Sequence, residues 1–207
     1  MNRFPVFQIA LLFFTIFLLR LPAEEVTDIP EIGAHEPILV VKKNVHPENL
    51  MVVYTKVDAS GHFVPDPHDP KRPVLDFYWL MDGKAYKPVN PLIKSEIRKH
   101  LELQPGASDA NHFVINLNDL KEVSSDIGQP KVEVSVDPAD GVHDVEARMN
   151  LGPSDGNARI RLTAIHTEGR AFPPAVYSVT LKGEEVTNGK LTGKRVTRRY
   201  DAKSKLN

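Results

Sequence analysis

Apolar and polar residues alternate along much of the chain after Pro37, which predicts β-strands with one buried and one exposed face. The clearest example is Lys131–Val136, where three valines share one face and the residues between them are polar. Asp144–Met149 repeats the pattern, and the intervening Asp137-Pro138-Ala139-Asp140-Gly141 has the composition of a turn. We therefore expect these two segments to form a β-hairpin.

Three other segments are apolar on both faces, which is typical of central strands that are covered on each side. They are Ile38–Val41, Leu50–Val57 and Val74–Met81. The remaining predicted strands are Phe113–Leu117, Arg159–Ile165, Val176–Leu181 and Lys194–Tyr200. A set of about nine strands favours an all-β or mainly β fold, an antiparallel β-sandwich or barrel.

One segment has the periodicity of a helix instead. Asn90-Pro91 combines a good helix cap with a residue suited to the first helical position. Ile93, Ile97 and Leu101 then recur every four residues until Pro105-Gly106 ends the run. We expect one short amphipathic helix that covers an open end or face of the sheet.

The first 23 residues have the layout of a secretory signal peptide. Arg3 gives a positive start, Phe4–Leu19 is an apolar run, and Leu21-Pro22-Ala23 supplies a helix stop and a small residue for cleavage. This run is shorter than the roughly 20 residues that a membrane span needs, so we expect no stable transmembrane anchor after cleavage.

The rest of the chain is expected to hold a single domain, because 207 residues suit one core of ordinary size. Residues 24–36 contain acids, a proline and a glycine without periodicity, which predicts a linker. Residues 37–200 are expected to form the β-rich domain, and residues 201–207 a basic C-terminal tail.

The absence of cysteine excludes disulfides, thiolate metal sites and a cysteine nucleophile. Exported eukaryotic domains of this size often carry disulfides, so the composition favours a bacterial protein. Together with the signal peptide, it predicts export to the periplasm or to the extracellular medium.

Positive charge gathers at the C-terminal end. Residues 187–207 contain seven basic side chains and one acidic one, whereas the chain after residue 23 has 24 basic and 27 acidic side chains in total. Charge on both faces of a strand here favours a protected sheet edge. The alternative is an anionic partner, such as lipid head groups or an acidic polysaccharide, bound by Lys194, Arg195, Arg198 and Arg199. The overall negative charge argues against nucleic acid.

A loop around residues 61–70 concentrates imidazole and carboxylate groups, which are ligands for divalent metal ions. The candidate ligands are His62, Asp66, His68 and Asp69, although their spacing matches no recognised metal motif. The three prolines of this segment equally favour a rigid surface loop. No Gly-x-Ser-x-Gly elbow and no Gly-rich phosphate loop occur, so we assign no catalytic residue.

Several short motifs resemble those of an uncharacterised family of predicted-secreted bacterial β-rich domains, one of the domain-of-unknown-function families. They span roughly residues 37–198 and are, in chain order, Asn49, Val52-Val53-Tyr54, Gly61, Pro73-Val74, Tyr78-Trp79, Glu96, Arg98, Tyr177–Gly183 and Thr192-Gly193-Lys194. The chain departs from the family pattern at His100-Leu101, where the family has a Tyr-Gly pair. The resemblance implies a compact exported β-rich domain and no particular activity.

These observations favour a non-catalytic exported domain that binds a partner or supports the cell envelope. Two alternatives stay open. One is a metal-assisted or carboxylate-based hydrolase that uses His62, Asp66 and His68, and the other is an accessory protein that binds an anionic envelope component through its C-terminal edge.

Overall fold

The fold is known from a computed structural model that describes residues 32–43, 50–81, 84–103, 110–118, 120, 130–137, 144–170 and 175–202. Within these ranges the chain is mostly strand, with one α-helix and a short 3-10 helix at Pro153–Asp155. The elements are β1 His35–Lys43, β2 Leu50–Lys56, β3 Pro65–Asp66, β4 Asp69–Pro73, β5 Asp76–Met81, β6 Lys84–Pro88, α2 Pro91–His100, β7 Leu101–Leu103, β8 His112–Leu117, β9 Lys131–Val136, β10 Val145–Asn150, β11 Arg159–Arg170, β12 Ala175–Thr187 and β13 Lys190–Asp201.

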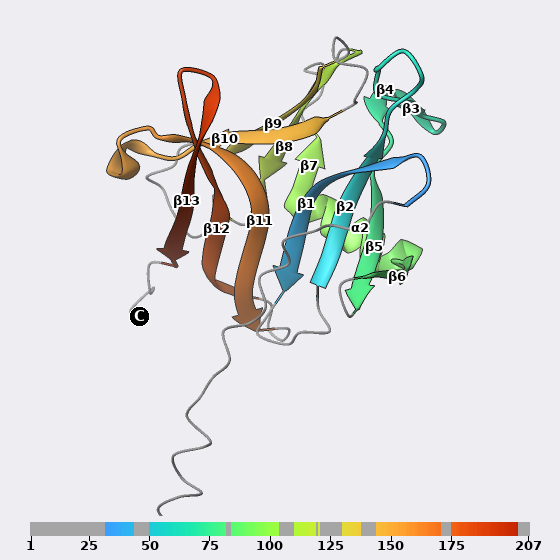
Figure 1. Ribbon diagram of the computed structural model, residues 1–207. Helices are drawn as coiled ribbons and strands as arrows, with labels where there is room; N and C mark the ends of the chain where they lie inside the picture. The colour runs from blue at the N-terminus through green and yellow to red at the C-terminus, as the bar shows by residue number, and fades with distance from the viewer. Residues whose placement is uncertain are drawn as a thin grey trace, which may run out of the picture.

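Eleven strands form one large sheet, and β3 and β4 form a separate small hairpin (Figure 1). The strand order β6-β5-β2-β1-β11-β10-β9-β8-β7 has two different ends, so the sheet is open and not closed into a barrel. β12 pairs with β11, and β13 pairs with β12. The prediction of a mainly β fold with one short helix is confirmed. The pairing is antiparallel except between β1 and β11, which run parallel.

The long strand β11 connects the two halves of the sheet, one formed by β6, β5, β2 and β1 and the other by β10, β9, β8 and β7. Its first residues pair with β10, and residues 164–167 pair with β1. Between these segments the register against β12 shifts at Leu162/Ala164. An irregularity of this kind bends a strand, so one continuous strand can belong to both halves.

The main core lies between the two halves of the sheet, because strands from both contribute to one apolar cluster. Leu39 and Phe77 come from the half that contains β1 and β5, and Val134 and Met149 come from the half that contains β9 and β10. A smaller cluster of Val40, Val52, Tyr54 and Leu80 occupies the opposite face of β1, β2 and β5. These strands are therefore apolar on both faces, as predicted, because each face is buried.

All nine predicted strands occur, and β9 has the predicted bounds. β9 and β10 pair antiparallel as expected, while the turn between them, at residues 138–143, lies outside the described residues. The predicted strand positions did not include β3, β4, β6 or β7. Three of these, β3, β4 and β6, contain prolines, which weaken a strand signal.

The helix begins where the sequence predicts and ends earlier. The Oδ1 of Asn90 accepts a hydrogen bond of 3.0 Å from the backbone N–H of Ile93, and Pro91 is the first helical residue. Leu101 continues the four-residue spacing but leaves the helix and pairs with Leu117 of β8. The expectation that Leu101 lies on the helix is wrong, because the sheet satisfies its backbone and buries its side chain.

β1 begins at His35 and so includes the last two residues of the expected linker. At the other end, β13 extends to Asp201, the first residue of the expected tail. The predicted signal peptide, most of the linker, and residues 203–207 lie outside the described residues.

Candidate functional site

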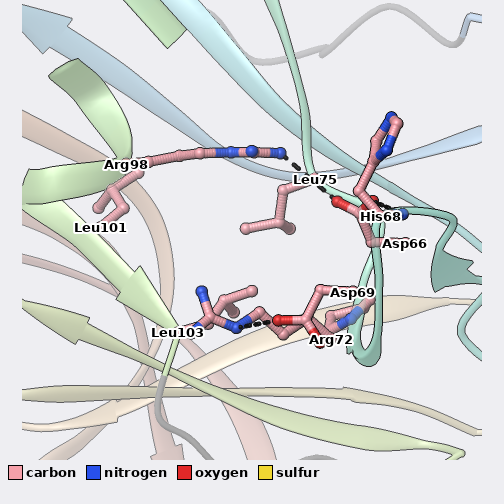
Figure 2. A pocket seen from close by; sticks show the side chains of 9 residues that line it. Asp66, His68, Asp69, Arg72, Leu75, Arg98, Leu101 and Leu103 are labelled. Atoms are coloured by element: carbon pink, nitrogen blue, oxygen red, sulfur yellow. Dashed lines mark hydrogen bonds and ion pairs between the residues drawn. The ribbon is translucent and has the colours of Figure 1, made fainter. Parts of the chain in front are cut away.

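A pocket of about 160 Å³ lies between the β3–β4 hairpin and the segment formed by the end of α2 and β7 (Figure 2). Its apolar lining consists of Pro73 and three buried leucines, Leu75, Leu101 and Leu103. These leucines also belong to the main core, so the packed interior of the domain holds this side of the pocket in place.

The remaining lining is charged or polar and forms two ion pairs. Arg98 of α2 reaches across to Asp66 of the hairpin, with 3.7 Å between Nη2 and Oδ2. Within the hairpin, the Nε of Arg72 lies 3.0 Å from the Oδ2 of Asp69. Figure 2 shows these pairs on either side of Leu75. The pocket thus combines an apolar wall with two positive and two negative groups, which together carry no net charge.

The β3–β4 turn orients Asp66. Its Oδ1 accepts a hydrogen bond of 2.9 Å from the backbone N–H of His68, an arrangement in which an aspartate closes a tight turn. The Oδ2 is left to face Arg98. A backbone constraint therefore fixes the carboxylate that meets the helix.

The structure brings together three of the four residues predicted to bind a metal. Asp66, His68 and Asp69 line the pocket, whereas His62 does not and its backbone N–H donates to Asp58. The two carboxylates face arginines, and the imidazole of His68 points away from Asp69 in Figure 2. In the part of the chain that the structure describes, no three His, Cys, Asp or Glu side chains converge as metal ligands do.

Arg72, Arg98 and the three leucines were not predicted from the sequence to belong to this site. One available signal was the i,i+3 spacing of Asp69 and Arg72. Arg98 was noted only among the residues of the family resemblance, which implies no site, because its partner is 32 positions earlier in the sequence and approaches only through the tertiary fold.

The basic C-terminal segment lies on β13, at an open edge of the large sheet in Figure 1. Two of its cations have acidic partners on β12 and β11. Lys194 pairs with Glu185 at 3.1 Å, and Arg199 lies 2.9 Å from Glu168.

Two more basic side chains of β13 have partners. Arg198 pairs with Asp155, and Arg195 makes an interaction as well. Three of the four candidate residues for an anionic partner, Lys194, Arg198 and Arg199, thus pair with carboxylates, and such charged residues suit edge protection.

Asp155 also fixes the end of β13. It lies in the short 3-10 helix before β11, and its Oδ2 accepts a hydrogen bond of 2.9 Å from the hydroxyl of Tyr200. Burial raises the pKa of the Tyr200 hydroxyl, and the adjacent Asp155 carboxylate raises it further. The phenol therefore stays a hydrogen-bond donor throughout the neutral range.

A second polar network anchors the helix to the sheet. Asp76 of β5 accepts from the Nζ of Lys94 in α2 at 2.9 Å and from the Nε2 of His35 in β1 at 3.0 Å. The Nδ1 of His35 lies 2.9 Å from the carbonyl oxygen of Ile32. Both partners of the ring are acceptors, so each ring nitrogen lies where an N–H can donate.

The same network determines the titration of Asp76. Burial raises the pKa of this carboxyl, but the hydrogen bonds and positive charges of Lys94 and His35 outweigh burial, and the net pKa lies below its usual range. Since Lys94 and Arg98 are four residues apart on α2, the helix that supplies Arg98 to the pocket is tied to β5 one turn earlier.

A scan against protein-family models, a search of curated proteins and a search of solved structures each find no match for this chain. The resemblance to a family of secreted bacterial domains therefore stays a prediction. In the described ranges, no helix has the length and apolar character needed to cross a membrane.

Proposed function

We propose that this protein is an exported, non-catalytic binding domain and that its ligand occupies the pocket between the β3–β4 hairpin and α2. The observation that carries the proposal is the convergence of three buried leucines and two arginine–carboxylate pairs, from separate parts of the chain, on one cavity. An apolar wall with a few polar groups is the usual composition of a small-molecule site.

The size of the pocket limits the ligand. A cavity of about 160 Å³ is smaller than the roughly 300–1,000 Å³ typical of sites for drug-sized molecules. The ligand that it encloses is therefore a small metabolite or one residue-sized group of a larger molecule. Export is supported by the signal-like composition of the first 23 residues.

The pairing of charges favours binding over hydrolysis. A carboxylate that acts as a general acid or nucleophile has a task-matched pKa and a clear path to the substrate. Asp66 and Asp69 instead each pair with an arginine of the same pocket, an arrangement that suits recognition of charged groups on a ligand.

Thermal melts of the purified protein test the proposal against a panel of sugars, carboxylic acids, amines, amino acids and divalent metal ions. A ligand at about 100 times its Kd stabilises the fold by about 2.7 kcal/mol. For a chain of this size that corresponds to a rise in Tm of roughly 5–11 °C.

Two leucine-to-phenylalanine variants locate the binding site. Leu103→Phe narrows the pocket and should abolish the rise in Tm, whereas Leu191→Phe at the exposed start of β13 should preserve it. If no compound of the panel raises the Tm, or if both variants lose the rise in Tm equally, the pocket is excluded as the binding site. A rise produced only by metal ions and lost in Asp66→Asn would instead support the hydrolase alternative.

A further inference from the structure

We infer that the pocket recognises a free α-amino acid with an apolar side chain, through Arg98 and Asp66 for the charged groups and the leucine wall for the side chain. The inference rests on the proposed function and specifies the chemical class of the ligand.

The nitrogen–oxygen separation of the Arg98–Asp66 pair, 3.7 Å, exceeds the 2.7–3.2 Å of a direct N–H···O hydrogen bond. The pair joins two elements on opposite sides of the pocket, α2 and β3. Arg72 and Asp69, by contrast, are neighbours in one hairpin at hydrogen-bond distance, 3.0 Å. The Arg98–Asp66 pair is thus the more open of the two.

The donors of Arg98 and the acceptors of Asp66 match the two charged groups of an α-amino acid. A guanidinium has five N–H donors in a planar fork, which suits bidentate binding of a carboxylate. Asp66 uses Oδ1 for the backbone of His68, and its Oδ2 faces the pocket, where it can accept from an ammonium group. An α-amino acid carries a carboxylate and an ammonium on one carbon atom, so both can meet this pair together.

The charges of the pocket residues Arg72, Arg98, Asp66 and Asp69 sum to zero. A ligand with only an anionic or only a cationic group therefore leaves the site with an uncompensated charge. A zwitterion preserves neutrality. The original ion pair is partly exposed on its Arg98 side, and exposed pairs contribute little to stability, so exchanging partners with the ligand is not prohibitive.

The apolar wall of the cavity includes Leu75, Leu101 and Leu103, which are 2%, 6% and 8% exposed. They offer a dry aliphatic surface that a polar or charged ligand side chain would not satisfy. The volume of the pocket excludes full enclosure of a longer peptide and is compatible with a single amino acid as the occupant.

Isothermal titration with L-leucine as the probe tests this class directly. N-acetyl-L-leucine lacks the ammonium group and L-leucinamide lacks the carboxylate, so each should bind about tenfold or more weakly than L-leucine. D-leucine determines whether the site also distinguishes the two configurations, and binding of either isomer with this dependence on both charges supports the inference. Equal affinity for L-leucine and one capped form would overturn it.

Variants assign each charged group of the ligand to a residue. In Arg98→Met the affinity for L-leucine should fall about tenfold or more, and L-leucinamide should no longer bind more weakly than L-leucine. Asp66→Asn should remove the discrimination against N-acetyl-L-leucine in the same way. Arg159→Met is the matched control, because Arg159 is similarly exposed, has a glutamate partner and does not line the pocket.

The outcomes separate this inference from the proposed function. If another small molecule binds and Leu103→Phe abolishes its binding, while L-leucine and D-leucine do not bind, the pocket stays the site and the amino-acid class is wrong. If no molecule binds there, both are wrong. If Arg98→Met does not fold, the comparison of capped and free leucine on the unmodified protein still decides the inference.

Discussion

Gly183 provides the sharpest test of how the two halves of the sheet are joined. It lies in β12, between Leu162 of β11 and Val196 of β13, next to the register shift at Leu162/Ala164. A Cβ at this position would lie 2.2 Å from the carbonyl oxygen of Arg161, whereas real Cβ contacts essentially never fall below 3.0 Å. The two strands approach too closely for any side chain.

Replacing Gly183 with alanine should therefore displace the backbone by about 0.8 Å. β12 is paired on both sides, so it cannot move away from β11 without weakening hydrogen bonds to one neighbour. Overpacking typically costs about 1–3 kcal/mol, and each weakened hydrogen bond about 1 kcal/mol more. We expect Gly183→Ala to lower the free energy of unfolding by roughly 3 kcal/mol, which corresponds to a Tm about 6–12 °C lower.

The assay is a thermal melt followed by circular dichroism, with Gly189→Ala as the control. Gly189 has a φ of +79° in the β12–β13 turn and open space around its Cβ position, so its substitution tests backbone strain without a clash. That strain is about 1 kcal/mol, or about 2–4 °C. A Tm for Gly183→Ala equal to or above that of Gly189→Ala would refute the close approach of β11 and β12.

Three further predictions concern stability. Asp76→Asn should lower the free energy of unfolding by about 1.5–3 kcal/mol at neutral pH. Because the folded pKa of Asp76 is lowered, its stabilisation is present above the unfolded value of about 3.9 and is lost as the pH falls through the folded pKa. Urea titrations between pH 7 and pH 2 should show that the free energy of unfolding depends less on acid pH in Asp76→Asn than in the unmodified protein, with the exposed Asp144→Asn as the control. Tyr200→Phe removes the hydrogen bond to Asp155 and should lower the urea midpoint by the equivalent of about 1.5 kcal/mol without changing the m-value. Phe113→Ala should cost about 3–5 kcal/mol in the same assay, because the ring is fully buried, and a loss under 1 kcal/mol would contradict its place in the core.

Strand positions were predictable because side-chain alternation is a local property of the backbone. Val132, Val134 and Val136 point into the core together, as their spacing requires. The same local information did not define the whole of β12 and β13, which extend to the turn at Asn188-Gly189. Both turn residues have positive φ, which is the geometry that an Asn-Gly pair favours in a two-residue hairpin.

The candidate site was predictable only in part. The hairpin loop contains Asp66, His68 and Asp69 within four residues, so its polar character was visible. The pairing of Asp66 with Arg98 could not be predicted from the sequence, because Arg98 comes from a helix that meets the loop only in the folded chain. The basic C-terminal segment shows the same limit, since carboxylates such as Glu168 lie far away in the sequence.

The sequence by itself thus determined the mainly β class, the positions of nine strands and the start of the helix, because each depends on periodicity or on a local cap. Only the tertiary structure decided that the sheet is open, that β1 and β11 run parallel, and that Leu101 leaves the helix for a strand. It also decided which charges meet. Strand order and charge pairing depend on contacts between residues that are distant in the sequence. Such contacts produce no periodic pattern of apolar and polar residues.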